Sequence, residues 1–149
     1  MIDNIPLPVV DNPIDAPFWS NAADGKLAVQ ICSSCNSARF PPGPYCSVCQ
    51  SPDHQWHVAS GIGTIWSYVI PHAPLLPAFS EQLPYIVALV ELNDYPGVRL
   101  VGAITESSDA KIQGVDGSRV AIGDSVRAVF SKMDDQTYLL RWRQAVDIL

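Results

Sequence analysis

All four cysteines of the sequence lie in one short stretch, as two C-x-x-C pairs. The first pair is Cys32 and Cys35, and the second is Cys46 and Cys49. Each pair can present two thiolates from one tight turn, and folding back residues 36–45 would bring four sulfurs to the corners of a tetrahedron. Four thiolates in that arrangement are typical of a structural zinc site, which has no open position for a substrate. The spacing therefore predicts a zinc ion that braces the fold.

Two other uses of the cysteines remain open at this point. Four thiolates also hold iron in small iron proteins, and two disulfides would use the same residues. A disulfide within a C-x-x-C pair closes a very small loop and stabilises little, and disulfides persist mainly in oxidising compartments, so zinc is favoured. Turns of this type often need a positive φ just after the second cysteine, where Asn36 and Gln50 replace the usual glycine.

The composition indicates a folded, acidic protein. Of its 149 residues, 48% are hydrophobic and 16% are charged, which supplies enough apolar material for a buried core. Fifteen acidic residues against nine basic ones give a net charge of −6, which disfavours a general attraction to nucleic acid. The first residues lack the pattern of a signal peptide, and no apolar run is long enough to span a membrane. We therefore expect a cytoplasmic protein with reduced cysteines and no membrane association.

The elements before the cysteines must position the first pair. Residues 1–14 are rich in Pro, Asn and Asp and are expected to form an extended arm. A short helix follows, with Asp15 as N-cap, Pro17 in the first turn and Gly25 at its end. Residues 26–31 then alternate between apolar and polar types and predict a strand that leads into Cys32.

The sequence after the cysteines is typical of a β protein. Strand-like stretches occupy 56–59, 61–70, 85–92, 98–105, 125–131 and 138–145. Glycines near the start of 61–70 predict a bulge or a sharp coil there. The expected fold is mainly β, with an N-terminal helix and a rubredoxin-like zinc ribbon in residues 15–58, followed by a five-stranded barrel of the OB type in residues 59–149.

The connection at residues 71–84 contains four prolines that keep it out of the sheet. Its large apolar side chains are Leu75, Leu76, Phe79 and Leu83. The segment could dock on a partner, or it could cover the core of its own barrel, and the sequence favours neither interpretation. His72 stands alone beside a proline, where a histidine is more often a surface or packing residue than a base.

Three of the six arginines are predicted to share one outer face of the last two strands. Because side chains alternate along a strand, Arg127, Arg141 and Arg143 point outward. The inward positions are Val126, Ala128, Phe130, Tyr138, Leu140 and Trp142. Such a cluster could bind phosphates or carboxylates, although a solvated strand face is the more ordinary interpretation.

No catalytic motif is visible. The sequence lacks G-x-S-x-G, the P-loop, G-x-G-x-x-G and H-E-x-x-H, so a catalyst that works alone is not expected. Zinc ribbons and OB folds also bind single-stranded nucleic acid, and Trp56, Trp66 and Tyr68 could stack on bases. That alternative needs a basic groove, which the acidic composition disfavours.

The order of motifs resembles the zinc-ribbon and OB-fold proteins associated with acyl-CoA metabolism, long described as a domain of unknown function. The matching motifs are Pro17-Phe18-Trp19, Gly25-Lys26-Leu27, the two cysteine pairs with Phe40-Pro41-Pro42 between them, Trp56, Ser60-Gly61-x-Gly63-Thr64, Pro84-Tyr85 and Gly123-Asp124-x-Val126. One departure is Gly43, which stands where a basic residue often follows the two prolines; Arg39 lies nearby.

The resemblance implies an accessory subunit that has no catalytic residues of its own. Similar proteins accompany thiolase-like enzymes, including aldolases that shorten steroid side chains, and some are paired with hydratases. The resemblance thus implies structural zinc, a CoA thioester at the interface, and a thiolase-like or hydratase partner that carries the catalytic residues. Arg39 and Phe40 join the proline-rich loop and the arginines as candidate ligand or partner contacts.

Overall fold

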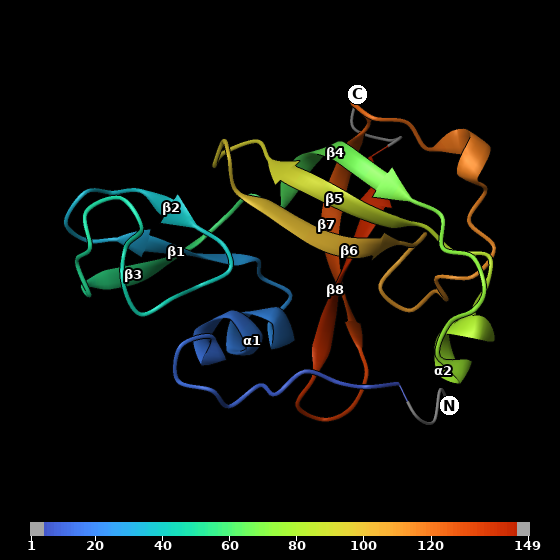
Figure 1. Ribbon diagram of the computed structural model, residues 1–149, viewed down its shortest axis with the longest axis horizontal. Coiled ribbons are helices and arrows are strands. Elements are labelled where there is room, and N and C mark those ends of the chain that lie inside the picture. The colour runs from blue at the N-terminus through green and yellow to red at the C-terminus, as the bar shows by residue number, and fades with distance from the viewer. Residues whose placement is uncertain (1–4, 146–149) are drawn as a thin grey trace.

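Helix α1 lies between a three-stranded sheet and a closed five-stranded barrel (Figure 1). The computed structural model describes residues 5–145. Residues 5–14 of the predicted arm contain no helix or strand, and the first four residues of that arm lie outside the described range.

Helix α1 spans Ala16–Ala23 and begins where the sequence predicted, with Pro17 in its first turn. Gly25 follows it with φ of +73°, a conformation that glycine adopts without steric cost. The predicted capping role of Asp15 is only half right, because Asp15 occupies the N-cap position but its side chain makes no capping hydrogen bond. The helix buries Phe18 and Ala22.

The small sheet carries the first cysteine. It has the order β2-β1-β3 and is antiparallel. Its strands are β1 (Ala28–Cys32), β2 (Ala38–Arg39) and β3 (His54–Val58). The alternating sequence pattern predicted a strand with one exposed face, but all five residues of β1 are buried. The central position of β1 explains this difference, since both of its edges are paired and both of its faces are covered.

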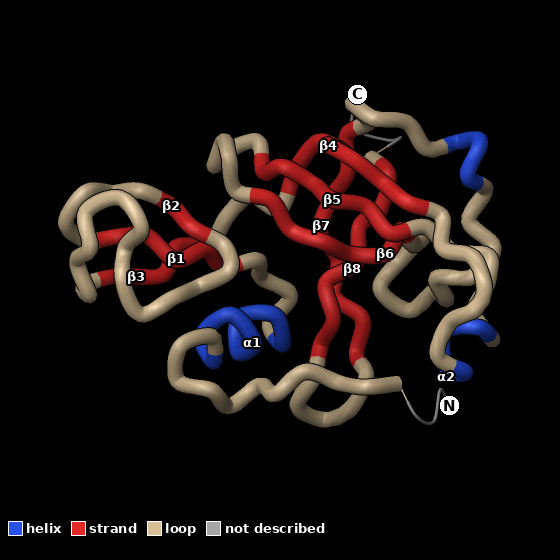
Figure 2. Tube along the Cα trace, viewed as in Figure 1, coloured by secondary structure: helices blue, strands red, loops and turns tan. Residues whose placement is uncertain are grey.

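The barrel has the strand order β4-β5-β6-β8-β7 and closes where β7 pairs with β4 (Figure 2). Its strands are β4 (Ile62–Val69), β5 (Val87–Leu92), β6 (Arg99–Ile104), β7 (Ser125–Lys132) and β8 (Tyr138–Gln144). Only β6 and β8 pair in parallel, and the other pairs are antiparallel. The five predicted barrel strands and the OB-type closure are therefore confirmed. The ladder irregularity lies between Ile65 and Ser67, in the middle of β4 and not at its glycine-rich start.

One hydrophobic core joins all these parts. It runs from Phe18 of α1 through Val29 of β1 to Val126 and Trp142 of the barrel. Trp142 is completely buried, and Gly102 on β6 leaves room for its indole: a Cβ there would lie 2.9 Å from Trp142 Cδ1. Within residues 5–145, no helix is long and apolar enough to cross a membrane.

Candidate metal centre and adjoining cleft

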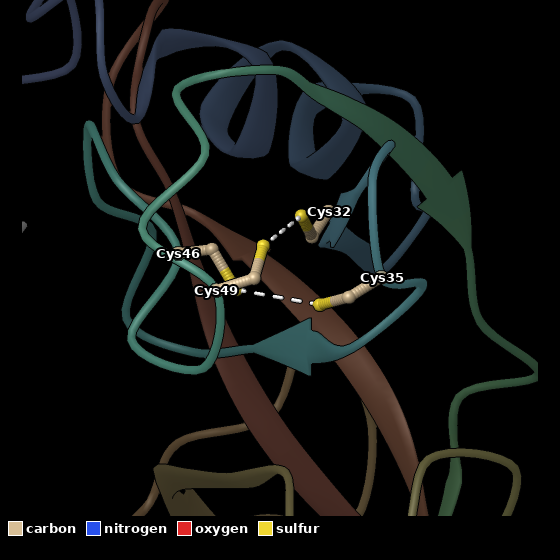
Figure 3. Close-up of side chains that lie close together, drawn as sticks. All are labelled: Cys32, Cys35, Cys46 and Cys49. Carbon is tan, nitrogen blue, oxygen red and sulfur yellow. Dashed lines mark hydrogen bonds between the residues drawn. The ribbon is translucent and has the colours of Figure 1, made fainter.

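The four cysteine sulfurs converge on one point at the end of the small sheet (Figure 3). The Sγ atoms of Cys32 and Cys49 are 3.6 Å apart, as are those of Cys35 and Cys46. All four sulfurs lie within 4.8 Å of one another. These separations are far longer than a disulfide bond of about 2.05 Å, and all four thiols are free.

The geometry fits a tetrahedral metal ion. With a zinc–sulfur distance of about 2.3 Å, the corners of a regular tetrahedron are about 3.8 Å apart, close to the two shorter separations. Four thiolates complete that coordination, so the ion would leave no position for a substrate.

Two matching turns present the sulfurs. In the first, the Cys32 N–H donates to the Ser37 carbonyl and the Asn36 N–H donates to the Cys32 carbonyl, both at 2.9 Å. In the second, Cys46 is tied in the same way to Ser51 and Gln50, also at 2.9 Å. Asn36 and Gln50 have φ values of 61° and 66°, as the sequence predicted for the residues after each pair.

In the metal-free chain, the pKa values of three of the four cysteine thiols are shifted, and not all in the same direction. The Ser37 hydroxyl, 3.2 Å away, and the backbone N–H groups of Cys49 and Val48 lower the pKa of the Cys46 thiol to about 5. Backbone N–H groups of Cys35 and Ser34 also lower the pKa of Cys32. At Cys49 the Ser51 N–H acts to lower the pKa, but the neighbouring sulfurs and burial together raise it to about 11. The Cys46 sulfur is therefore prepared as a thiolate before metal binds.

The segment between the cysteine pairs turns back along the barrel. Arg39 donates from Nη2 to the Gly43 carbonyl at 3.1 Å, while its Nε and Nη1 are buried without a partner among the described residues. The Gly43 N–H donates to the side-chain oxygen of Gln30, a fully buried residue of β1, at 2.9 Å. The ring of Phe40 contacts that of Phe18 of α1, with centroids 5.3 Å apart and the rings tilted at 56°. These contacts place Phe40 and the two prolines after it against the barrel.

An apolar cleft of about 380 Å³ opens between this segment, α1 and the outer face of β5, β6 and β8. Its apolar walls include Phe18, Trp19, Phe40, Pro41, Pro42, Phe79, Tyr85, Val87, Val101, Ala103, Ile112, Leu139 and Leu140. The charged residues on its wall are Asp15 and Arg141. Asp15 therefore faces the cleft, and its Oδ1 is buried without a hydrogen bond to any residue of the range 5–145.

The proline-rich connection folds partly onto the barrel, where it contains a short helix, α2 (Pro77–Ser80), that the sequence did not predict. Leu75, Phe79 and Leu83 pack on a cluster that centres on Tyr85, Ala103 and Ile112. Leu76 remains 59% exposed, and His72 is also exposed. The segment thus covers its own barrel with three of its four large apolar side chains and leaves one in solvent.

The register of β7 and β8 confirms that the three arginines share one outer face, although their surroundings differ. Arg127 and Arg143 are directly opposed on β7 and β8, and both are exposed. Arg141 pairs with Val129, farther along the same ladder, and is half-buried at the edge of the cleft.

Sequence reasoning missed several members of this site. Gln30 carried a visible signal, because it is a polar residue inside an apolar strand. Ile112 and the cleft-facing position of Asp15 carried none, since only the tertiary fold brings them beside β6 and β8.

The fold and the site define a class: a zinc-ribbon protein with an OB-fold barrel. The family model described as the rubredoxin-like zinc ribbon domain of ChsH2 matches residues 19–55, and that of the ChsH2 C-terminal OB-fold domain matches residues 56–131. The chain therefore belongs to the ChsH2 family, and the resemblance stated from the sequence is confirmed.

Curated relatives include two hydratase subunits and an archaeal scaffold. A probable enoyl-CoA hydratase alpha subunit of Thermomonospora curvata is 36% identical over 95% of this chain and 40% of its own length. The 3-oxo-4,17-pregnadiene-20-carboxyl-CoA hydratase alpha subunit of Mycobacterium tuberculosis is 36% identical over 79% of this chain and 34% of its own length. This chain therefore spans less than half the length of both. A DUF35 domain-containing scaffold protein of Methanocaldococcus jannaschii is 28% identical, over 70% of this chain and 67% of its own.

A solved structure agrees with these relatives. A chain of the Ltp2-ChsH2(DUF35) aldolase superposes with a TM-score of 0.77 at 33% identity, covering 93% of this chain and 100% of that one.

Proposed function

We propose that this chain is a non-catalytic subunit of an enzyme that acts on CoA thioesters. In this role it docks on a thiolase-like or hydratase catalytic subunit in the cytoplasm and helps to form the acyl-CoA site. The enzyme would be a carbon–carbon lyase of the aldolase type or a thiolase-type acyltransferase. The observation that carries the proposal is the likeness to the aldolase chain, which extends over the whole of that chain.

In this proposal Cys32, Cys35, Cys46 and Cys49 hold a structural zinc ion. The ion supplies rigidity and no chemistry, because four thiolates fill its coordination sphere. It fixes the two turns, and through them the segment that carries Phe40 and the prolines of the cleft wall. The match to a zinc ribbon favours zinc over iron. A colourless purified protein with one zinc per chain by elemental analysis is the expected result.

Coexpression with the products of neighbouring genes, followed by affinity capture, tests the assembly. We expect recovery of a thiolase-like or hydratase subunit. Cys46→Ser should lose the metal and reduce that recovery, whereas Ser47→Ala, on an exposed residue between the two ligands of the second pair, should change neither. A monomer that captures no such subunit would refute the assembly, and turnover of a thioester by the isolated chain would refute the non-catalytic role.

A salt titration distinguishes the proposed function from the nucleic-acid-binding alternative. A protein of net charge −6 should show no appreciable binding to single-stranded oligonucleotides at moderate ionic strength. Tight binding that weakens steeply with salt would instead support that alternative.

A further inference from the structure

Arg141 lies where two cavities meet. On one side is the apolar cleft of about 380 Å³, and on the other is a second cavity of about 470 Å³. Both cavities are lined by Arg141 and Ile112, so they adjoin at these two residues. The barrel thus carries an apolar space and a polar space side by side, with one guanidinium between them.

The guanidinium of Arg141 has no partner among residues 5–145, where it makes no hydrogen bond and no ion pair. Burial lowers the pKa of Arg141, although an arginine remains charged at neutral pH. A half-buried guanidinium with five donors and no acceptor is costly to keep. An acceptor from outside the chain would remove that cost.

The two cavities differ in chemistry. The cleft wall is almost entirely apolar, whereas the second cavity is lined by Lys111, Lys132 and Arg141 against a single carboxylate, Asp109. The buried Ser131 hydroxyl also lines the second cavity and has no partner in the part of the chain that the structure describes. One of these three cations, Lys132, forms an ion pair with Asp135 at 3.3 Å, so Lys111 and Arg141 are the cations of this lining that have no ion pair within residues 5–145.

The loop that supplies Lys111 and Ile112 is held in place. The hydroxyl of Thr105, a buried residue, donates to the Ser107 carbonyl at 3.0 Å. The Gln113 side chain donates to the Leu83 carbonyl at 2.8 Å, and the Gly114 N–H donates to the Pro84 carbonyl at 2.9 Å. These hydrogen bonds hold the loop that supplies Lys111 and Ile112 against the barrel beside Arg141.

We propose that this junction binds a small amphipathic anion, whose apolar body fills the cleft and whose carboxylate or phosphate accepts hydrogen bonds from Arg141. The cleft volume lies within the range of small-molecule sites, which are mostly apolar with a few polar groups. A guanidinium binds carboxylate and phosphate through two parallel hydrogen bonds. Asp15, which does not pair with Arg141, disfavours an anion near α1 and so directs the headgroup toward β8. The site consists of this chain alone and does not depend on the proposed assembly.

Calorimetric titration of the zinc-loaded full chain, without any catalytic subunit, tests the proposal. The probes share one alkyl chain and differ in the headgroup: dodecanoate, dodecyl phosphate, dodecanol and dodecyltrimethylammonium, each below its micelle concentration. We expect both anions to bind, dodecanol to bind at least about tenfold more weakly, and the cation not to bind. Equal binding of all four probes by the unmodified chain, or no binding of the anions, would overturn the proposal.

Single-residue variants test whether the anionic headgroup of the probe binds at Arg141. Arg141→Gln should weaken both anions about 10- to 100-fold, the range for a hydrogen bond to a charged group, and leave dodecanol within about twofold. Arg127→Gln, on an exposed arginine of the neighbouring strand that lines neither cavity, is the matched control and should change nothing. Equal losses in the two variants would refute the role of Arg141.

Two further results define the ligand. Lys111→Gln should weaken dodecyl phosphate more than dodecanoate if the natural headgroup is a phosphate, and should affect neither if it is a carboxylate. Val101→Trp, which adds bulk on the cleft wall at a position that is 62% exposed, should weaken the binding of both anions and of dodecanol. Unchanged binding in that variant would place the alkyl chain elsewhere and contradict the proposal.

Discussion

At the scale of single residues, Ser37 controls the ionisation of the metal centre although it is not a ligand. Its hydroxyl lies 3.0 Å from the sulfur of Cys35 and 3.2 Å from that of Cys46, and it is the largest cause of the lowered Cys46 pKa. A thiol whose pKa is depressed in the folded chain stabilises that chain above its unfolded pKa. The contribution is lost as the pH falls from about 9 through about 5.

We therefore predict that Ser37→Ala raises the pKa of Cys46 in the metal-free protein toward its ordinary value. The ultraviolet absorbance of the thiolate, followed during a pH titration, measures the change. Metal binding should also weaken more steeply on acidification, because protons then compete better for that sulfur. Ser33→Ala, on an exposed serine of the first turn that makes no contact with Cys46, is the control. An unchanged titration in Ser37→Ala would show that the backbone donors alone set the pKa.

We predict that Arg141 lowers the stability of the folded chain, because burial removes water from its charge. Methionine has a similar length and no charge, so Arg141→Met removes the cost of a half-buried cation without leaving a large void. We expect the free energy of unfolding to rise by about 1 kcal/mol and Tm by about 2–4 °C, measured by thermal denaturation. Arg127→Met changes an exposed side chain and should stay within about 0.5 kcal/mol. A fall in Tm for Arg141→Met would mean that the guanidinium stabilises the folded chain.

At the scale of the elements, the close antiparallel pairing of β4 and β5 depends on a glycine. A Cβ on Gly63 would clash with the Val90 side chain and lie 2.7 Å from the carbonyl oxygen of Glu91, which belongs to the paired strand and cannot rotate away. Gly63→Ala should therefore cost about 1–3 kcal/mol of stability, read as a lower Tm.

Gly43→Ala provides the comparison, because the nearest heavy atom to a Cβ there is the Tyr45 oxygen at 3.9 Å. It should unfold within about 0.5 kcal/mol of the parent. Similar stability of both variants would show that β4 and β5 can move apart enough to accept a Cβ without a loss in the free energy of unfolding.

The elements were predictable where the pattern is local. The alternation of apolar and polar residues predicted all five barrel strands to within about two residues, because side chains on a strand alternate between its two faces. The cysteine spacing predicted both turns and the positive φ that follows each pair. The double burial of β1, the bulge in the middle of β4 and the short helix α2 depend on which elements pack together. The cleft could not be predicted for the same reason, since its walls come from segments far apart in the chain.

At the scale of the whole molecule, the continuous core makes the ribbon and the barrel one folding unit. Val29 of β1 and Phe18 of α1 belong to the same buried cluster as Trp142 of the barrel, so the small sheet cannot unfold without exposing part of the barrel core. Metal bound only by the folded chain should therefore stabilise the entire protein. The coupling also lets the four sulfurs influence the cleft, which is formed by α1, the segment after Arg39 and the barrel.

Chelation of the metal tests this coupling by scanning calorimetry. With zinc about a thousandfold above its Kd, binding contributes about 4 kcal/mol, so its removal should lower Tm by about 10 °C in a single transition. The Cys46→Ser chain should already melt near the lower temperature and show no further shift with chelator. A barrel transition that stays in place while a separate ribbon transition disappears would show that the two parts fold independently, and the metal could then no longer be expected to shape the cleft.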